Sequence, residues 1–130
     1  MATVELSASN FSDTVTAEGI KIIDFWAEWC GPCRQFAPIF EEASTKHPDI
    51  VFGKIDTEAE RQLAADAQIT SIPTLMAFRD GVLLFNQAGA LPGAGLEQLI
   101  AALRAVDMDA VRADIAKQDA ERNSSPETQG

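Results

Sequence analysis

The chain has 130 residues and carries 20 acidic against 10 basic side chains, which gives a net charge of −10 at pH 7. This length suits one domain that can bury a hydrophobic core without metal or disulfide support. The acidic balance argues against nucleic acid and anionic membranes as partners, since both require surfaces rich in lysine and arginine. No apolar stretch approaches the roughly 20 residues of a membrane span, and the N-terminus lacks the pattern of a signal peptide, so we expect a cytoplasmic protein.

The first part of the chain predicts a strand, a short helix and a second, buried strand. Residues 3–6 suit a short edge strand, and Ser9 or Asn10 can cap the brief helix that follows. The apolar run over 21–27 predicts the buried strand, although Asp24 stands in its middle. Burial of an unpaired carboxyl is costly and raises its pKa, which suits a general base working near neutral pH. The alternative is that strand alternation turns Asp24 to solvent.

Both cysteines of the chain stand in Trp29-Cys30-Gly31-Pro32-Cys33, where the strand gives way to a helical pattern over 34–47. Pro32 fits the first helical turn, and the three-residue separation puts the two sulfurs within disulfide reach. Cys30 then lies at the helix N-terminus, where unpaired amides and the helix dipole lower the pKa of a thiol and so favour the nucleophilic thiolate. Cys33, one turn further on, is expected to be more buried. We infer that Cys30 attacks and Cys33 resolves.

A cysteine pair can also form a structural disulfide or bind a metal. A structural disulfide is unusual in a reducing compartment. A zinc site needs four ligands, and the chain adds only His47, far along the same helix, so we expect no metal site. The helix-start position therefore favours a redox dithiol.

The second half of the chain predicts three more strands and two more helices. The strands are expected over 50–55, 74–79 and 82–88, and the helices over 58–68 and 95–105. Asp80-Gly81 between the last two strands is a strong signal for a tight antiparallel hairpin. The order of elements predicts an α/β fold with a central mixed β-sheet flanked by helices on both faces.

The C-terminal segment changes character after the last of these helices. We expect the folded domain to cover 1–106, a short acidic extension to cover 107–122, and a disordered tail to cover 123–130. Asp107 and Asp109 interrupt the preceding helix, and either can cap a further one. The single thin apolar stripe of the extension buries little area, which favours a solvated appendage over a docking segment.

The sequence resembles the bacterial type of the thioredoxin family over roughly residues 6–104. Beyond the cysteine motif, the matching stretches follow the family's order: Asp24-Phe25-Trp26-Ala27-Glu28, Ala37-Pro38, Lys54-Ile55-Asp56, Ile72-Pro73-Thr74 and Phe78-Arg79-Asp80-Gly81. The resemblance implies the thioredoxin fold and a protein-disulfide reductase that acts by dithiol–disulfide exchange, maintains thiols and donates electrons to target proteins. It also implies that the protein binds no metal or organic cofactor, that a thioredoxin reductase supplies its electrons, and that the protein is a monomer.

The resemblance also implies roles for single residues. Asp24 matches an aspartate that helps to deprotonate the resolving cysteine, so it would act on Cys33. Lys54 matches a lysine near that aspartate, although on its own it is a solvated strand lysine. The peptide bond before Pro73 is cis in the family and leaves the backbone of Ile72 free to pair with an extended substrate segment.

A shallow apolar patch around Cys30 is the expected docking surface for targets. Trp29 would be partly exposed there, and a family glycine that matches Gly89 keeps the surface flat. The expected substrate-binding residues are Trp29, Gly31, Pro32, Ile72, Pro73 and Gly89. Two competing functions stay open: an oxidase or isomerase of the same fold, which the Gly31-Pro32 dipeptide disfavours, and a non-catalytic interaction module.

Overall fold

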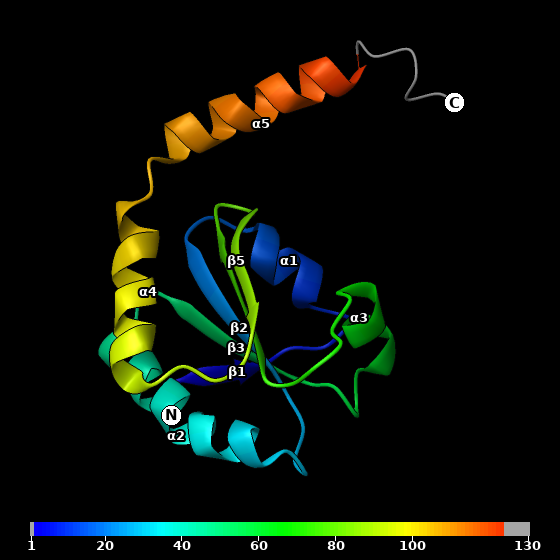
Figure 1. Cartoon of the computed structure of the whole chain (residues 1–130), viewed down its shortest axis with the longest axis vertical. Coiled ribbons are helices and arrows are strands. Elements are labelled where there is room, and N and C mark those ends of the chain that lie inside the picture. Colours follow the sequence, from blue (N-terminus) through cyan, green and yellow to red (C-terminus); the bar gives the residue numbers. More distant parts are fainter. Residues whose placement is uncertain (1, 124–130) are drawn as a thin grey trace.

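A computed structural model of the chain describes residues 2–123 as a five-stranded sheet with helices on both faces (Figure 1). The strands are β1 (Thr3–Glu5), β2 (Ile20–Trp26), β3 (Val51–Asp56), β4 (Thr74–Arg79) and β5 (Val82–Ala88). The helices are α1 (Phe11–Thr16), α2 (Gly31–Lys46), α3 (Arg61–Asp66), α4 (Gly93–Ala105) and α5 (Met108–Asn123). Among the described residues, none of these helices is long and apolar enough to cross a membrane.

The sheet is mixed, as the order of elements predicted. Its strand order is β1-β3-β2-β4-β5, in which β1, β3 and β2 run parallel while β4 and β5 are antiparallel to their neighbours. The central strand β2 is buried along nearly its whole length because helices cover both of its faces. This central place explains the continuous apolar run in the sequence.

Two separate hydrophobic clusters lie on the two faces of the sheet. Alternation along β2 sends Ile22 to the face under α2 and α4, where it joins Phe36 and Ile100. The next residue, Ile23, belongs to the opposite cluster, where it packs with Val15 of α1. A strand with one exposed face cannot supply both clusters, so the two-sided burial confirms the predicted α/β architecture.

The hairpin between β4 and β5 follows the prediction from Asp80-Gly81. Both residues have positive φ, 53° and 83°, which is the requirement for a two-residue turn that matches the twist of the strands. The backbone amide of Asp80 also donates to the carbonyl of Gly19 at 3.0 Å, which ties the turn to the segment before β2.

Two local predictions were wrong in detail. Asn10 is the N-cap residue of α1, one of the two positions expected, but its Oδ1 accepts the amide of Ser7 at 2.7 Å instead of an amide of the helix. The helix expected over 58–68 is only α3, because Asp56 Oδ1 accepts the amide of Glu58 at 2.9 Å and holds these residues in a turn.

The extension beyond α4 forms the helix α5. Asp107 Oδ1 accepts the amide of Ala110 at 3.1 Å and so caps its first turn. Met108 is buried against the domain, while the later turns of α5 are exposed and point away from the sheet (Figure 1). The tail expected over 123–130 lies outside the described residues except for Asn123, the last residue of α5.

Candidate redox site

The two cysteines form a disulfide at the start of α2, with their Cα atoms 5.2 Å apart. Cys30 is the N-cap residue of this 16-residue helix, and its Sγ accepts the backbone amide of Cys33 at 3.2 Å. Pro32 occupies the first turn as predicted. Cys33, at 2% exposure, is marginally more buried than Cys30, at 4%, as expected. An amide aimed at Sγ of Cys30 stabilises a thiolate at that sulfur once the disulfide is reduced.

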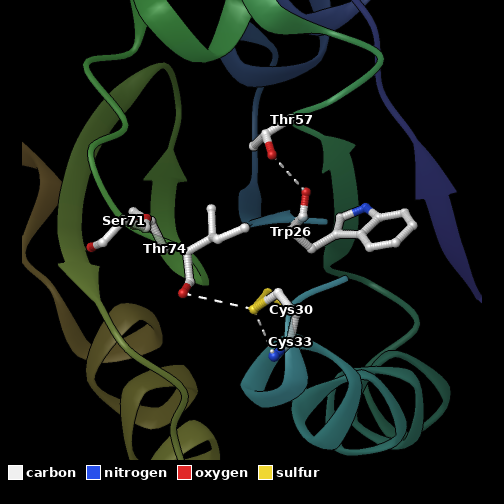
Figure 2. The surroundings of a disulfide bond; sticks show 7 residues. Trp26, Cys30, Cys33, Thr57, Ser71 and Thr74 are labelled. Carbon is white, nitrogen blue, oxygen red and sulfur yellow. Dashed lines mark hydrogen bonds between the residues drawn. A yellow bond between two sulfur atoms is a disulfide. The ribbon is translucent and has the colours of Figure 1, made fainter. Parts of the chain in front are cut away.

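The loop before β4 brings a second backbone segment to the disulfide. The Ile72–Pro73 peptide bond is cis, as the resemblance implied. Sγ of Cys30 lies 3.8 Å from the carbonyl oxygen of Ile72, and the carbonyl of Pro73 accepts the amide of Gly89 at 2.7 Å. Residues far apart in the sequence, from α2, the loop before β4 and the segment after β5, thus meet at one end of the central strands. Figure 2 shows the two cysteines beside the segment that carries Ser71 and Thr74.

Asp24 lies inside the sheet, which excludes the alternative that it faces solvent. Its side chain is 1% exposed, and neither carboxylate oxygen has a hydrogen-bond partner within the described part of the chain. Burial raises the pKa of Asp24 from 3.8 to about 7, and the charge of Lys54 lowers it by a smaller amount. By strand alternation Asp24 shares the face of Ile22, the face that α2 covers.

Lys54 stands beside Asp24 in the register of the β2–β3 pair. Its Nζ lies 4.8 Å from the centroid of the Trp26 ring, a cation–π contact. Lys54 is half-buried. The structure therefore brings Asp24 and Lys54 together as expected, with Trp26 as a third member of the group.

A cleft of about 350 Å³ lies next to the disulfide on one side. Its lining residues are Trp29, Thr57, Ala64, Ile69, Thr70, Ser71 and Ile72. Trp29 is 68% exposed, so a large aromatic side chain stands at the rim of the cleft and in solvent. Of the expected docking residues, Trp29 and Ile72 line this cleft, whereas Gly31, Pro32, Pro73 and Gly89 lie outside its lining.

Sequence reasoning missed two threonines that hold the backbone on either side of the disulfide (Figure 2). Thr57 Oγ1 donates to the carbonyl of Trp26 at 3.0 Å, and Thr74 Oγ1 donates to the carbonyl of Ser71 at 2.6 Å. The bond of Thr57 depends on how distant segments meet, so no local pattern marks it, whereas the bond of Thr74 is local and spans only three residues. Thr74 did stand in one of the stretches that carry the resemblance.

Comparison with known proteins agrees with this geometry. The family model described as Thioredoxin matches residues 2–102, which is most of the chain. The chain belongs to the thioredoxin family. A Streptomyces coelicolor protein named "Putative thioredoxin 2" is 53% identical over 120 residues, covering 92% of this chain and 90% of that one. Thioredoxin of Rhodospirillum rubrum is 44% identical over 86 residues, covering 65% of this chain and 83% of that one.

The solved structures support the same assignment. The structure of Plasmodium falciparum thioredoxin matches with a TM-score of 0.70 at 33% identity, covering 77% of this chain and 97% of that one. The chain is thus a bacterial-type thioredoxin and a thiol–disulfide oxidoreductase, which reduces disulfides in target proteins by exchange with the Cys30–Cys33 pair. The alignment with the Streptomyces relative leaves only about ten residues of this chain unmatched, so it extends past residue 102 into α5.

Proposed function

We propose that the reaction proceeds with Cys30 as nucleophile and Cys33 as resolving thiol. The Cys30 thiolate attacks one sulfur of the target disulfide, so that a mixed disulfide forms and the other target sulfur leaves as a thiolate. Cys33 then loses its proton and attacks Sγ of Cys30, which releases the second target sulfur. Two electrons pass from the Cys30–Cys33 dithiol to the target, and the intramolecular disulfide forms. The observation that carries this assignment is the Cys33 amide aimed at Sγ of Cys30.

Asp24 is the proposed base for the proton of Cys33. A carboxyl with a pKa of about 7 accepts a proton near neutral pH, whereas an ordinary exposed aspartate is a much weaker base. Its burial without hydrogen-bond partners and its place on the face that α2 covers support this role. Lys54 has a supporting role, because its charge keeps the pKa of Asp24 from rising further.

Target binding is assigned to the surface around the disulfide. We assign Trp29 and Ile72 to it because both line the cleft next to Cys30. Gly31 and Gly89 suit a flat contact surface, since an added Cβ at either would project into open space. Pro32 and Pro73 complete the set. An extended target segment pairing with the backbone of Ile72 would place its disulfide against Cys30.

We propose that a flavin- and NADPH-dependent thioredoxin reductase reduces this protein. We also propose that this protein acts in the cytoplasm. The support is the family membership and the similarity to bacterial thioredoxins. We also propose that it acts as a monomer, since dithiol–disulfide exchange as written needs no residue from a second copy.

The test of the two cysteine roles is a pair of serine variants. Cys33→Ser should accumulate mixed disulfides between Cys30 and target proteins, because the resolving thiol is gone. Cys30→Ser is the matched control and should trap far less. Non-reducing gels of each variant mixed with an oxidised protein substrate give the readout. Equal trapping by both variants would remove the assignment of roles. Trapping by Cys30→Ser alone would reverse it.

An oxidase or isomerase of the same fold is the second candidate, and the reduction potential separates it from a reductase. A value near roughly −270 mV, typical of thioredoxins, supports a reductant. A value of roughly −120 to −180 mV is typical of oxidases and isomerases and would reverse the direction of electron flow. Equilibration of the Cys30–Cys33 pair against dithiothreitol mixtures gives this number directly.

A further inference from the structure

The carbonyl of Trp26 accepts two hydrogen bonds from one residue. The backbone amide of Thr57 donates to it at 2.9 Å, and the Oγ1 hydroxyl of Thr57 donates to it at 3.0 Å (Figure 2). A carbonyl oxygen has two acceptor sites, so Thr57 alone occupies both. The hydrogen bond from the backbone amide continues the pairing of β2 with β3. The hydrogen bond from the hydroxyl is additional and needs a serine or threonine at position 57.

This carbonyl stands at the point where the redox turn begins. Trp26 is the last residue of β2, and the next carbonyl, of Ala27, accepts the amide of Cys30 at 3.2 Å. Ala27 is fully buried and forms one apolar cluster with both cysteines, against which Trp26 packs. The hydroxyl of Thr57 therefore anchors the backbone that leads into Cys30.

The hydroxyl bond has unequal importance in the two redox states. In the disulfide form the covalent bond itself holds Cys30 against Cys33. In the dithiol form only non-covalent contacts fix the turn. The disulfide and the Thr57 hydroxyl hold the same turn geometry, so each strengthens the other. The anchoring contact therefore stabilises the disulfide more than the flexible dithiol.

We propose that Thr57 is a positioning residue that holds the redox turn in the geometry of the disulfide and thereby tunes the reduction potential. Stabilisation of the oxidised form makes such a pair more reducing, so loss of the Thr57 hydroxyl makes the potential less negative. A twofold to fivefold change in the dithiol–disulfide equilibrium constant is expected. At about 30 mV per tenfold, this is a shift of roughly 10 to 20 mV.

The experiment compares three variants of the full chain by equilibration against dithiothreitol mixtures. Thr57→Val removes the hydroxyl at nearly constant volume and should shift the potential to a less negative value. Thr57→Ser keeps the hydroxyl and should return the wild-type potential. Thr45→Val is the matched control, since Thr45 is exposed on α2 and its hydroxyl also donates to a backbone carbonyl, that of Glu41 at 3.2 Å. It should leave the potential unchanged.

Three results would overturn the proposal: an unchanged or more negative potential in Thr57→Val, the same shift in Thr57→Ser, or the same shift in Thr45→Val. If Thr57→Val does not fold, Thr57→Ala is judged by the same criteria. The inference rests on the Cys30–Cys33 couple but not on which cysteine attacks. Failure of Cys33→Ser to trap targets would thus contradict the proposed roles while leaving the potentials of the Thr57 variants to decide this inference separately.

Discussion

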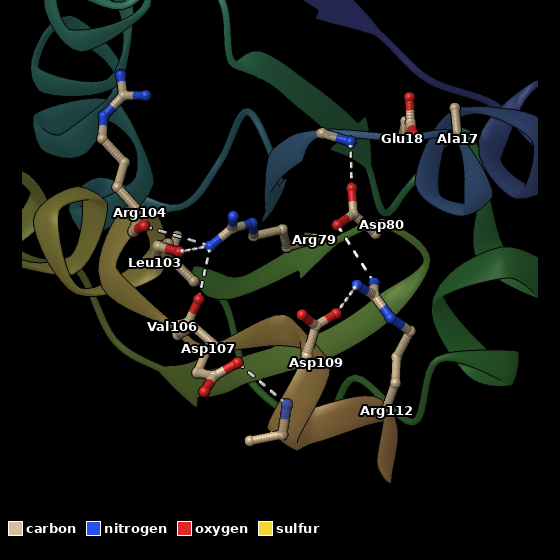
Figure 3. Close-up of polar contacts among 12 residues, drawn as sticks. Ala17, Glu18, Arg79, Asp80, Leu103, Arg104, Val106, Asp107, Asp109 and Arg112 are labelled. Carbon is tan, nitrogen blue, oxygen red and sulfur yellow. Dashed lines mark hydrogen bonds and ion pairs between the residues drawn. The ribbon is translucent and has the colours of Figure 1, made fainter. Parts of the chain in front are cut away.

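Two aspartates at opposite ends of the β2–β4 pair have opposite surroundings. Asp24, near the disulfide, is buried and has no hydrogen-bond partner among the described residues. Asp80, in the turn at the far end, accepts the amide of Gly19 at 2.8 Å and faces Arg112 at 3.6 Å (Figure 3). Burial raises the pKa of Asp24 to about 7, whereas the Gly19 amide lowers the pKa of Asp80.

The contrast extends to the groups around each aspartate. At the far end the charged groups find partners: Arg79 donates from Nη1 to the carbonyls of Leu103, Arg104 and Val106, at 2.8, 3.3 and 3.1 Å (Figure 3). Lys21 donates to the carbonyls of Ala17, Glu18 and Gly19. At the disulfide end, Asp24 is buried without a hydrogen-bond partner among the described residues, which costs stability. At the other end, Asp80 and Arg79 bind backbone groups of turns and helices and so stabilise the fold.

The two ends therefore respond to pH in opposite directions. The raised pKa of Asp24 means that the folded state holds its proton more tightly than the unfolded state. This contribution to stability is present below the ordinary pKa of 3.8 and is lost as the pH rises through about 7. The lowered pKa of Asp80 gives a contribution that is present above 3.8 and is lost as the pH falls below that value.

The largest expected effect is a gain in stability from Asp24→Asn. At pH 8 the wild-type protein buries a charged carboxylate, so the variant should be more stable, by up to about 4 kcal/mol if the whole pKa shift is recovered. The gain should shrink towards pH 4, where Asp24 is protonated. Urea unfolding of the oxidised forms between these pH values measures it. Asp114→Asn, on the exposed part of α5, is the control. A gain that is the same at pH 4 and pH 8 would contradict the raised pKa.

The same substitution should slow the resolving step if Asp24 is the base. In the wild-type protein the rate of mixed-disulfide resolution is expected to rise with pH through about 7, and in Asp24→Asn this rise should disappear. The loss at pH 7 should reach up to about a hundredfold, the lower end of typical general-base contributions. Stopped-flow decay of a preformed mixed disulfide on Cys30 gives the rate. An unchanged pH profile would assign Asp24 to stability alone.

At the far end, Arg79→Gln should destabilise the fold by about 1.5 to 3 kcal/mol. The substitution removes charge-assisted hydrogen bonds to the carbonyls at the end of α4 and leaves the reduction potential untouched, because the disulfide lies at the other end of the sheet. Thermal unfolding and the potential are measured on the same sample. Arg61→Gln, whose side chain is exposed and pairs with Glu58 at 3.0 Å, is the control. A shift in the reduction potential of Arg79→Gln would show that the two ends of the sheet are energetically coupled.

The smallest effect is expected for Arg112→Gln. Its ion pairs with Asp80 and Asp109 are solvent-exposed, and such pairs contribute under about 1 kcal/mol. The measured loss in unfolding free energy should therefore be small and should vanish in 1 M salt. A loss as large as that of Arg79→Gln would mean that α5 is held mainly by this ion pair rather than by buried Met108.

The sequence predicted the parts of the site that depend on neighbours along the chain. The C-x-x-C pair with Pro32 indicated a helix start, and Asp80-Gly81 indicated the hairpin, because both signals are local. The burial of Asp24 was not decidable from alternation, since β2 is covered on both faces and each position of it is inside. The bond of Thr57 to Trp26 was not predictable, because it joins two strands whose contact follows from the strand order.

The helix α5 also sets where further groups can be attached. Its 16 residues span about 24 Å, and it leaves the domain at the end of α4, away from the turn that carries the cysteines (Figure 1). A surface or fused domain coupled through exposed positions late in α5 would therefore stand clear of Trp29 and the cleft beside it. Immobilised in this way, the protein would leave the disulfide and the cleft beside it accessible to large substrates.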